Sequence, residues 1–399
     1  MPRLPALPYL ALKSNLLGTL CRSGRTRFGD AILSEDLTAG LCIAKYGLRN
    51  IMPREKLFTV LWVTAGIILG LVLGWLVLRG VNWSSMLSAF GRVSWDVLVP
   101  AVAAVIASLF LQAVRWKLML PHESVSTVRL FFVRNAGMSL NNLSFAQGGG
   151  ILGDASELAM LTRSDKIDGS KVVASLFMAR ALDFVITSIF VLVGFFIVPQ
   201  LGVFKPMIIP VLVVMALIVL FVLFARKVGR FPVLNKVRVL ESSLHAVAFL
   251  RDRKLIFWLS ISLTVLAWML LGTAAWLVAQ AIGIQLPFWM MSIILVGMTL
   301  FSGAIPAAPS AIGTYEFVTV YILGLFSIDK SDALCFALLV HALVMIPPNL
   351  MGIPTISREW KTFRQITSQA GAVLKQRFLR RRAVAIQPPA DISVESDLV

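Results

Sequence analysis

The hydrophobic positions of the chain form long continuous blocks, separated by polar segments rich in Lys and Arg. A transmembrane helix needs about 20 mostly apolar residues to cross a hydrocarbon core of roughly 30 Å. Six blocks reach this length: 58–78, 96–114, 172–198, 207–225, 255–281 and 333–356. The pattern predicts an all-α, polytopic membrane helix bundle.

The basic residues are distributed unevenly between the two sides of this bundle. Of the 37 Lys and Arg residues, 32 lie on one side of the membrane. They occur before the first span, between spans two and three, in 226–254 and in the tail. The other loops hold four, and Arg180 lies inside a span. Because cytoplasmic loops carry the excess of Lys and Arg, we expect both termini to be cytoplasmic.

The apolar stretch 288–328 is interrupted by Pro306, Pro309 and Gly313. Its second half, 317–328, would rise only about 18 Å as a helix and cannot cross the bilayer. Since the preceding span ends outside and the tail is inside, the stretch crosses twice or not at all. We expect a re-entrant hairpin from the outer face, giving six full spans. Two full crossings, giving eight spans, are the alternative.

Segment 126–165 shows a similar interruption, with Asn141 and Asn142 followed by the glycine run 148–150 and by Gly153. It predicts a second broken hairpin, entering from the cytoplasmic face. An interfacial amphipathic loop is the alternative. Span, span, hairpin, span then occurs in both halves, about 58–198 and 207–356, with opposite orientation. Inverted repeats of this kind occur in transporters, and their breaks are expected to meet inside the protein.

Composition agrees with a membrane protein, since 58% of residues are hydrophobic and 14% are charged. The net charge of +17 is explained by basic residues beside spans, so nucleic acid is not an expected partner. The three cysteines have no metal-ligand spacing. No phosphate loop and no sizeable soluble domain are visible, so we expect neither an enzyme nor a cofactor.

Residues 1–51 differ from the membrane domain, 52–357, because they hold scattered Arg and Pro and no span. Met52 directly precedes the first apolar helix, which indicates that 1–51 is an over-extended reading of the gene. The alternative is a disordered basic arm, and an intact mass of the native protein distinguishes the two. The tail, 358–399, is expected to be basic and then disordered.

Span one carries Gly66, Gly70 and Gly74 at four-residue spacing. Such a ridge of small residues allows close helix contact. The pattern leaves open whether the contacting helix belongs to this chain or to a second copy in a homo-oligomer.

Ionisable residues within predicted spans and breaks are candidates for function. Arg180 and Asp183 lie three residues apart in span three, where a simple mutual ion pair is the alternative. His341 lies in the last span, as a proton relay or as a packed, hydrogen-bonded residue.

Carboxylates also follow both predicted breaks. Asp154 and Glu157 follow the first, and Glu316 follows the second. Their placement fits proton coupling or contact with a cationic headgroup, or mere compensation of helix dipoles. The helix that starts after each break would favour an anion such as a lipid phosphate.

Three stretches resemble the membrane domain of the lysylphosphatidylglycerol synthase family, also called flippase-like or UPF0104. They are Asn142 with Gly153-Asp154, then Arg180-x-x-Asp183, and Pro306-x-x-Pro309 with Gly313-x-x-Glu316. The likeness runs from about Phe58 to Ser357. Glu157, Ser310-Ala311 and His341 depart from the family pattern, which commonly has Arg, Gly-Gly and Arg there.

The resemblance implies the lipid-moving part of the family without the aminoacyl-transferase domain. We therefore expect a bacterial inner-membrane, flippase-like protein that translocates a phospholipid or polyprenyl-linked lipid between leaflets. The first alternative is a non-transporting lipid-binding or scaffold subunit for a separate membrane enzyme. A membrane glycosyltransferase-related protein is a weaker alternative, because no nucleotide-sugar site is visible.

Overall fold

The computed structural model describes residues 54–120, 123–143, 151–228, 253–304 and 309–360. These residues are helical, with no strand among them. By its contacts the chain divides into two compact units, Met1–Val60 and Leu61–Val399. The glycine run 148–150, Pro306 and nearly all of the predicted N-terminal extension and tail lie outside the described residues.

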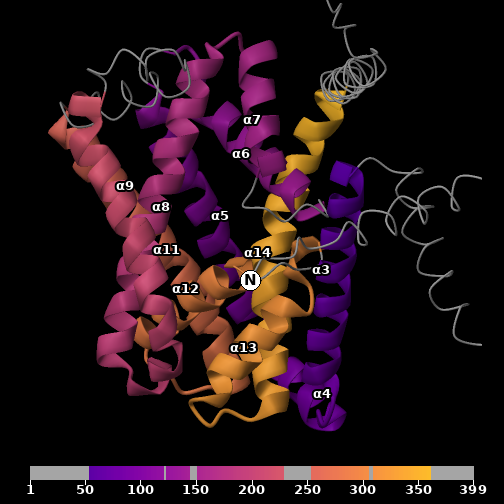
Figure 1. The fold of residues 1–399 in the computed structure, drawn as a ribbon. Helices are drawn as coiled ribbons and strands as arrows, with labels where there is room; N and C mark the ends of the chain where they lie inside the picture. The colour runs from indigo at the N-terminus through magenta and orange to yellow at the C-terminus, as the bar shows by residue number, and fades with distance from the viewer. Residues whose placement is uncertain (1–53, 121–122, 144–150, 229–252, 305–308, 361–399) are drawn as a thin grey trace, which may run out of the picture. The chain divides into compact units, whose positions relative to one another are not determined.

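Each of the six predicted spans coincides with one helix of Figure 1. These helices are α3 (Arg54–Leu78), α5 (Trp95–Met119), α8 (Gly169–Ile197), α9 (Ile208–Val228), α11 (Lys254–Ile282) and α14 (Lys330–Arg358). Four of them, α5, α8, α11 and α14, are long and apolar enough to span a membrane alone. The total is up to six if two bent pairs are each one span: α3 with α4 (Trp83–Arg92), bent by 91°, and η1 (Pro199–Met207) with α9, bent by 73°.

Large apolar side chains on these helices are exposed, including Leu71 at 69%, Trp258 at 62% and Leu350 at 64%. Soluble monomers rarely expose apolar surface on this scale, whereas lipid tails cover it at no cost. Together with the four apolar spans, this exposure establishes a multi-pass membrane protein.

Two hairpins of short helices occupy the predicted broken stretches. The first comprises α6 (Thr127–Leu143) and α7 (Ile151–Arg163), and the second comprises α12 (Phe288–Ala304), η3 (Pro309–Ala311) and α13 (Thr314–Gly324). The 11 residues of α13 rise about 16 Å, well short of a bilayer core. The sequence placed the second half of this hairpin at 317–328, whereas α13 begins three residues earlier.

The two hairpins enter the bundle from opposite ends (Figure 1), and the end of α6 in the first contacts η3 of the second. Ser310 Oγ donates to the main-chain oxygen of Asn142 at 2.9 Å, and Asn142 Nδ2 donates to Asn349 Oδ1 at 3.2 Å. Leu130, Val133 and Ala136 of α6 are fully buried. The first hairpin is therefore embedded in the bundle, and the alternative of an interfacial loop is wrong.

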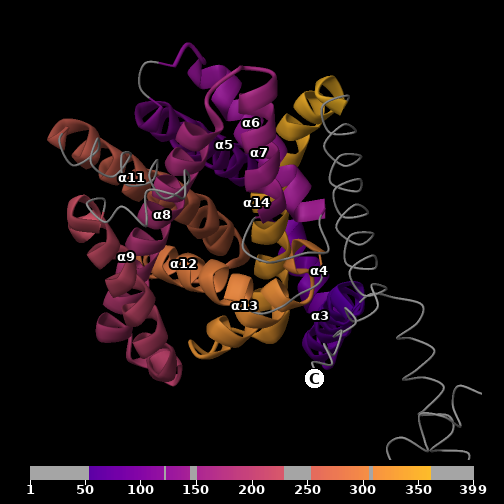
Figure 2. The ribbon, with the colours of Figure 1, turned by 45° about the horizontal axis from the view of Figure 1, so that its top comes forward.

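Helix packing is reciprocal between the two halves. Helix α6 of the first hairpin packs on α14, and α12 of the second hairpin packs on α8 (Figure 2). The second span of each half, α5 and α11, pack along one another. This exchange of contacts is the arrangement expected of the predicted repeat.

Glycines set the closest helix approaches. A Cβ on Gly153 would lie 2.7 Å from Gly137 O, where α7 crosses α6, and a Cβ on Gly352 would lie 2.5 Å from Asn135 O, where α14 crosses α6. Span one uses its glycine ridge within the chain, since a Cβ on Gly74 would lie 3.6 Å from Gly313 Cα. The homo-oligomer stays a prediction.

Sequence inspection missed α4, which lies in the loop between the first two spans. Asn82 caps it, because its Oδ1 accepts the Ser85 N–H at 3.2 Å. The signal was available, since Asn at an N-cap directly before a ten-residue amphipathic segment marks a helix start.

Candidate functional site

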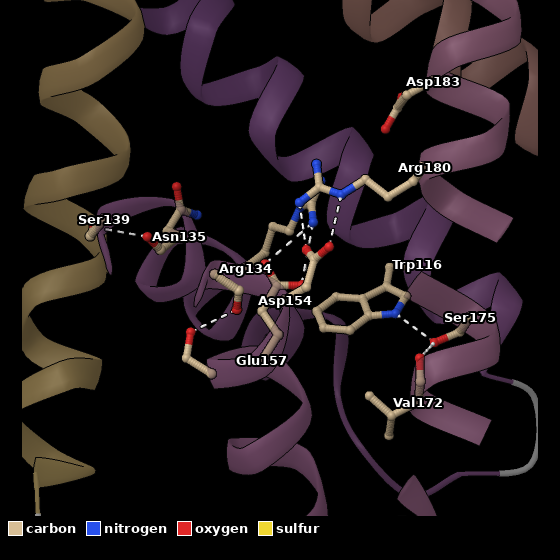
Figure 3. Close-up of polar contacts among 12 residues, drawn as sticks. Trp116, Arg134, Asn135, Ser139, Asp154, Glu157, Val172, Ser175, Arg180 and Asp183 are labelled. Atoms are coloured by element: carbon tan, nitrogen blue, oxygen red, sulfur yellow. Dashed lines mark hydrogen bonds and ion pairs between the residues drawn. The ribbon is translucent and has the colours of Figure 1, made fainter. Parts of the chain in front are cut away.

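A six-charge cluster lies where α5, α6, α7 and α8 meet, and Figure 3 shows its side chains other than Arg115. It comprises three arginines and three carboxylates, whose formal charges cancel: Arg115, Arg134, Arg180, Asp154, Glu157 and Asp183. The electrostatic neighbours of Arg134 include Glu157, Arg180, Asp183 and Arg115, so the three ion pairs belong to one cluster.

The pair of Arg115 and Asp183 joins α5 to α8. Arg115 donates from Nη1 and Nη2 to the two carboxylate oxygens of Asp183 at 2.6 and 2.8 Å. Nη1 also donates to Thr264 Oγ1 of α11 at 2.7 Å. The Arg115 side chain is only 2% exposed. Two-pronged pairing of this kind fixes geometry, and here it fastens three helices together.

The pair of Arg134 and Glu157 joins the two arms of the first hairpin. Arg134 Nη1 lies 3.3 Å from both Glu157 oxygens, and the two side chains are 5% and 1% exposed. A Cβ on Gly137 would lie 2.4 Å from Glu157 Oε1, so the glycine makes room for the carboxylate. This ion pair is buried inside the protein and links α6 to α7.

The pair of Arg180 and Asp154 is more open than the other two. Arg180 Nη2 donates to Asp154 Oδ1 at 2.6 Å, and the side chains are 42% and 27% exposed. Figure 3 shows the two side chains pointing toward one another from α8 and α7, beside the buried Arg134 and Glu157. Of the cluster's three pairs, this one is the most open to an incoming ligand.

These contacts correct one sequence-based alternative. Arg180 and Asp183 do not pair with each other, because each has a stronger partner on another helix. The sequence also treated Arg115 as a loop residue, since it ended span two at residue 114, but α5 continues to Met119. Arg134 was not singled out as a candidate from the sequence. For both residues, the signal available was an arginine within an otherwise apolar segment.

The second hairpin has a smaller polar centre, formed by Glu316 and His341. His341 Nδ1 lies 2.7 Å from Glu316 Oε1, and Nε2 lies 2.9 Å from the Ser310 main-chain oxygen. Glu316 Oε2 accepts the Gly313 N–H at 2.7 Å. The Tyr315 ring stacks on the imidazole with centroids 4.4 Å apart. His341 therefore connects α14 to both sides of the η3 turn.

Backbone conformation at this turn is unusual. Ser310, Ala311 and Gly313 have φ values of 57°, 56° and 84°, in the left-handed region. A Cβ on Gly313 would lie 2.0 Å from Gly70 O, so this position needs glycine for both its φ and its contact with α3. Pro309 begins the same turn. The turn places Ser310 against Asn142 and thereby joins the two hairpins.

A third polar group closes the base of the first hairpin. Arg129 donates to Asp165 at 3.1 Å and to Glu359 at 2.7 Å, linking the ends of α6, α7 and α14. Partial burial opposes the charge of Arg129, but hydrogen bonds to the two carboxylates outweigh burial and raise its pKa. In the described part of the chain, no group of three or more His, Cys, Asp or Glu side chains is placed to hold a metal ion.

Most predicted site residues are thus brought into two centres and a junction. Asp154, Glu157, Arg180 and Asp183 lie in the six-charge cluster, with Gly153 at the crossing beneath it. Gly313, Glu316 and His341 lie in the second centre, and Asn142 lies at the junction.

Comparison with protein families gives one match. The model of the lysylphosphatidylglycerol synthase TM region matches residues 63–352, which include both hairpins, four of the six long helices in full and most of α3 and α14. The chain belongs to this family. The resemblance noted in the sequence is therefore confirmed, and membership relates the protein to lipid handling. A search of curated proteins found no match.

Two departures from the pattern of the lysylphosphatidylglycerol synthase TM family have structural partners. Glu157, at a position where the resemblance leads us to expect Arg, pairs with Arg134. His341, at a position in the last span where the resemblance leads us to expect Arg, contacts Glu316. At both positions, the side chain found in this protein therefore has a polar partner on a neighbouring helix.

Proposed function

We propose that this protein binds a phospholipid or polyprenyl-linked lipid and translocates it between the leaflets of the bacterial inner membrane. Both termini would face the cytoplasm, as the distribution of Lys and Arg favours. The observation that carries the proposal is the contact of Ser310 with Asn142, which joins two oppositely directed hairpins inside the bundle.

Lipid translocation requires a polar path for the headgroup through an apolar bilayer. Charged side chains within a membrane are costly and mark the pathways of substrates. The six-charge cluster lies beside the first hairpin, and the pair of Glu316 and His341 lies beside the second. A headgroup moving between the leaflets would therefore meet polar side chains from both hairpins.

The weak polar contacts between the two hairpins also fit this function. Two hydrogen bonds of Asn142, to Ser310 and to Asn349, link it to the second half of the chain. Such bonds contribute about 1 kcal/mol each, so they can open and close during transport. A permanent seal would instead be expected to rest on apolar packing.

The test cross-links residues 142 and 310, so that the two hairpins cannot separate. The variant Asn142→Cys with Ser310→Cys is prepared in a background where the three native cysteines, Cys21, Cys42 and Cys335, are Ala. It is reconstituted into liposomes with acyl-labelled fluorescent lipids, and dithionite quenching reports lipid movement. A short bifunctional thiosulfonate should stop movement, and a reductant should restore it. Each single-cysteine variant serves as a control and should be insensitive to the reagent.

Movement that continues through the cross-linked protein would contradict the proposed path. If the uncross-linked protein moves no lipid above the empty-liposome baseline under any ion gradient, translocation is wrong. Lipid co-purification in native mass spectrometry would then favour the non-transporting lipid-binding subunit.

A further inference from the structure

Charge balance in the six-charge cluster limits which headgroup can enter it. In a low-dielectric interior, an ion that loses its partner is strongly destabilised, so a favoured ligand must leave no charge unpaired. Arg115 with Asp183, and Arg134 with Glu157, are already paired and carry the most buried side chains of the cluster. A ligand would therefore exchange with the open pair, Arg180 and Asp154.

When a ligand displaces the contact between Arg180 and Asp154, it leaves one cation and one anion that each need a new partner. Arg180 has guanidinium donors 2.6 and 3.4 Å from Asp154, and releasing Asp154 frees them for a phosphate. The Asp154 carboxylate is freed at the same moment and needs a cation. Asp154 lies in the first turn of α7, and the positive end of the helix dipole there also favours the phosphate.

From this balance we infer that the lipid moved by this protein is a zwitterionic phospholipid with a primary amine, of the phosphatidylethanolamine kind. Its phosphate pairs with Arg180 and its ammonium group donates to Asp154. The inference rests on the proposed function and specifies the headgroup for the same site.

Other headgroups fit the pair less well. An anionic headgroup such as phosphatidylglycerol pairs with Arg180 but leaves Asp154 without a cation. A polyprenyl phosphate has the same defect. The quaternary ammonium of phosphatidylcholine balances the charge but has no N–H to donate to the carboxylate. The expected order of rates is phosphatidylethanolamine first, phosphatidylcholine second and phosphatidylglycerol last.

The test compares these three lipids in liposomes containing the full chain. The fluorophore is placed on the acyl chain, because a headgroup label would consume the amine. Wild-type protein should move phosphatidylethanolamine about tenfold faster than phosphatidylglycerol, the effect expected when the partly buried Asp154 carboxylate lacks its hydrogen-bonded partner.

Two variants separate specificity from folding. Asp154→Asn removes the carboxylate and leaves the cluster with one excess positive charge, so it should slow phosphatidylethanolamine and speed phosphatidylglycerol. A gain of rate for one lipid cannot result from loss of folded protein. Arg180→Gln removes the phosphate partner and should slow all three lipids.

Asp332→Asn is the matched control. Asp332 forms a similarly open ion pair with Arg92, at 2.8 Å and with side chains 31% and 48% exposed, away from the cluster. This variant should keep the wild-type order of lipids. Equal rates for phosphatidylethanolamine and phosphatidylglycerol in wild type, or an unchanged order in Asp154→Asn, would overturn the inference while leaving translocation intact. Absence of movement for all three lipids would instead count against the proposed function and, with it, the inference.

Discussion

Glu316 and His341 contact one another inside the second hairpin, with Oε1 and Nδ1 2.7 Å apart. The other imidazole nitrogen faces the Ser310 carbonyl, and the other carboxylate oxygen accepts the Gly313 N–H. The imidazole is thus held between two oxygen acceptors.

Replacement of Glu316 should distinguish its hydrogen bonds from its charge. Gln at this position can accept the Gly313 N–H and donate to His341, so Glu316→Gln should change the free energy of unfolding by less than about 1 kcal/mol. Glu316→Ala leaves both partners unpaired and should cost about 2–4 kcal/mol. Thermal unfolding in detergent micelles measures the difference, and equal losses in both variants would contradict the assigned bonds.

The same Glu316→Gln variant should move lipid more slowly than wild type although it remains folded. The physical reason is that the neutral amide removes the charge that a headgroup or proton meets at the second hairpin. Dithionite quenching in liposomes gives the rate, with unfolding of the same preparation as its control. A wild-type rate would show that Glu316 serves only to hold the turn.

Gly313→Ala should be strongly destabilising. A left-handed φ costs an L-residue about 1–2 kcal/mol, and the new methyl group would clash with Gly70 O, for about 2–5 kcal/mol together. Gly91→Ala is the control, because a Cβ there meets nothing within 4 Å. That change lies within helix α4 and should be neutral or slightly stabilising. A small effect at Gly313 would argue against the close approach of α3.

Ser310 combines a tertiary hydrogen bond with left-handed backbone. Ser310→Ala and Ser310→Gly both remove the bond to Asn142, but only glycine relieves the strain at φ 57°. Ser310→Gly should therefore be more stable than Ser310→Ala by about 1 kcal/mol, as measured by unfolding. The reverse order would indicate that the turn does not hold this conformation.

Arg134 and Glu157 should be strongly coupled in a double-mutant cycle. Either single change to Met leaves a buried charge unpaired and should cost about 3–5 kcal/mol. Changing both to Met removes the two charges together and should recover most of that loss. If the two losses simply add, the ion pair is not the reason for the destabilisation.

Much of the fold follows from local properties of the sequence. The six spans and the two broken stretches depend on apolar length, Pro and Gly, which act within one segment of chain. For the same reason Asp154, Glu157 and Glu316 could be placed beside breaks in advance. Amphipathic α4 was missed because attention to apolar length passes over a short capped helix outside the spans.

Charge pairing was decided by the tertiary structure. Arg180 and Asp183 are neighbours on one helix, yet Arg180 binds Asp154 and Asp183 binds Arg115, which lies 68 positions away. These choices depend on how closely whole helices approach, and that is set by contacts such as Gly137 with Gly153. The sequence by itself determined which segments cross the membrane and which are broken, because hydrophobicity and backbone stereochemistry are local. Only the tertiary structure decided which charges pair and which pair stays open, because those distances arise from packing between remote segments.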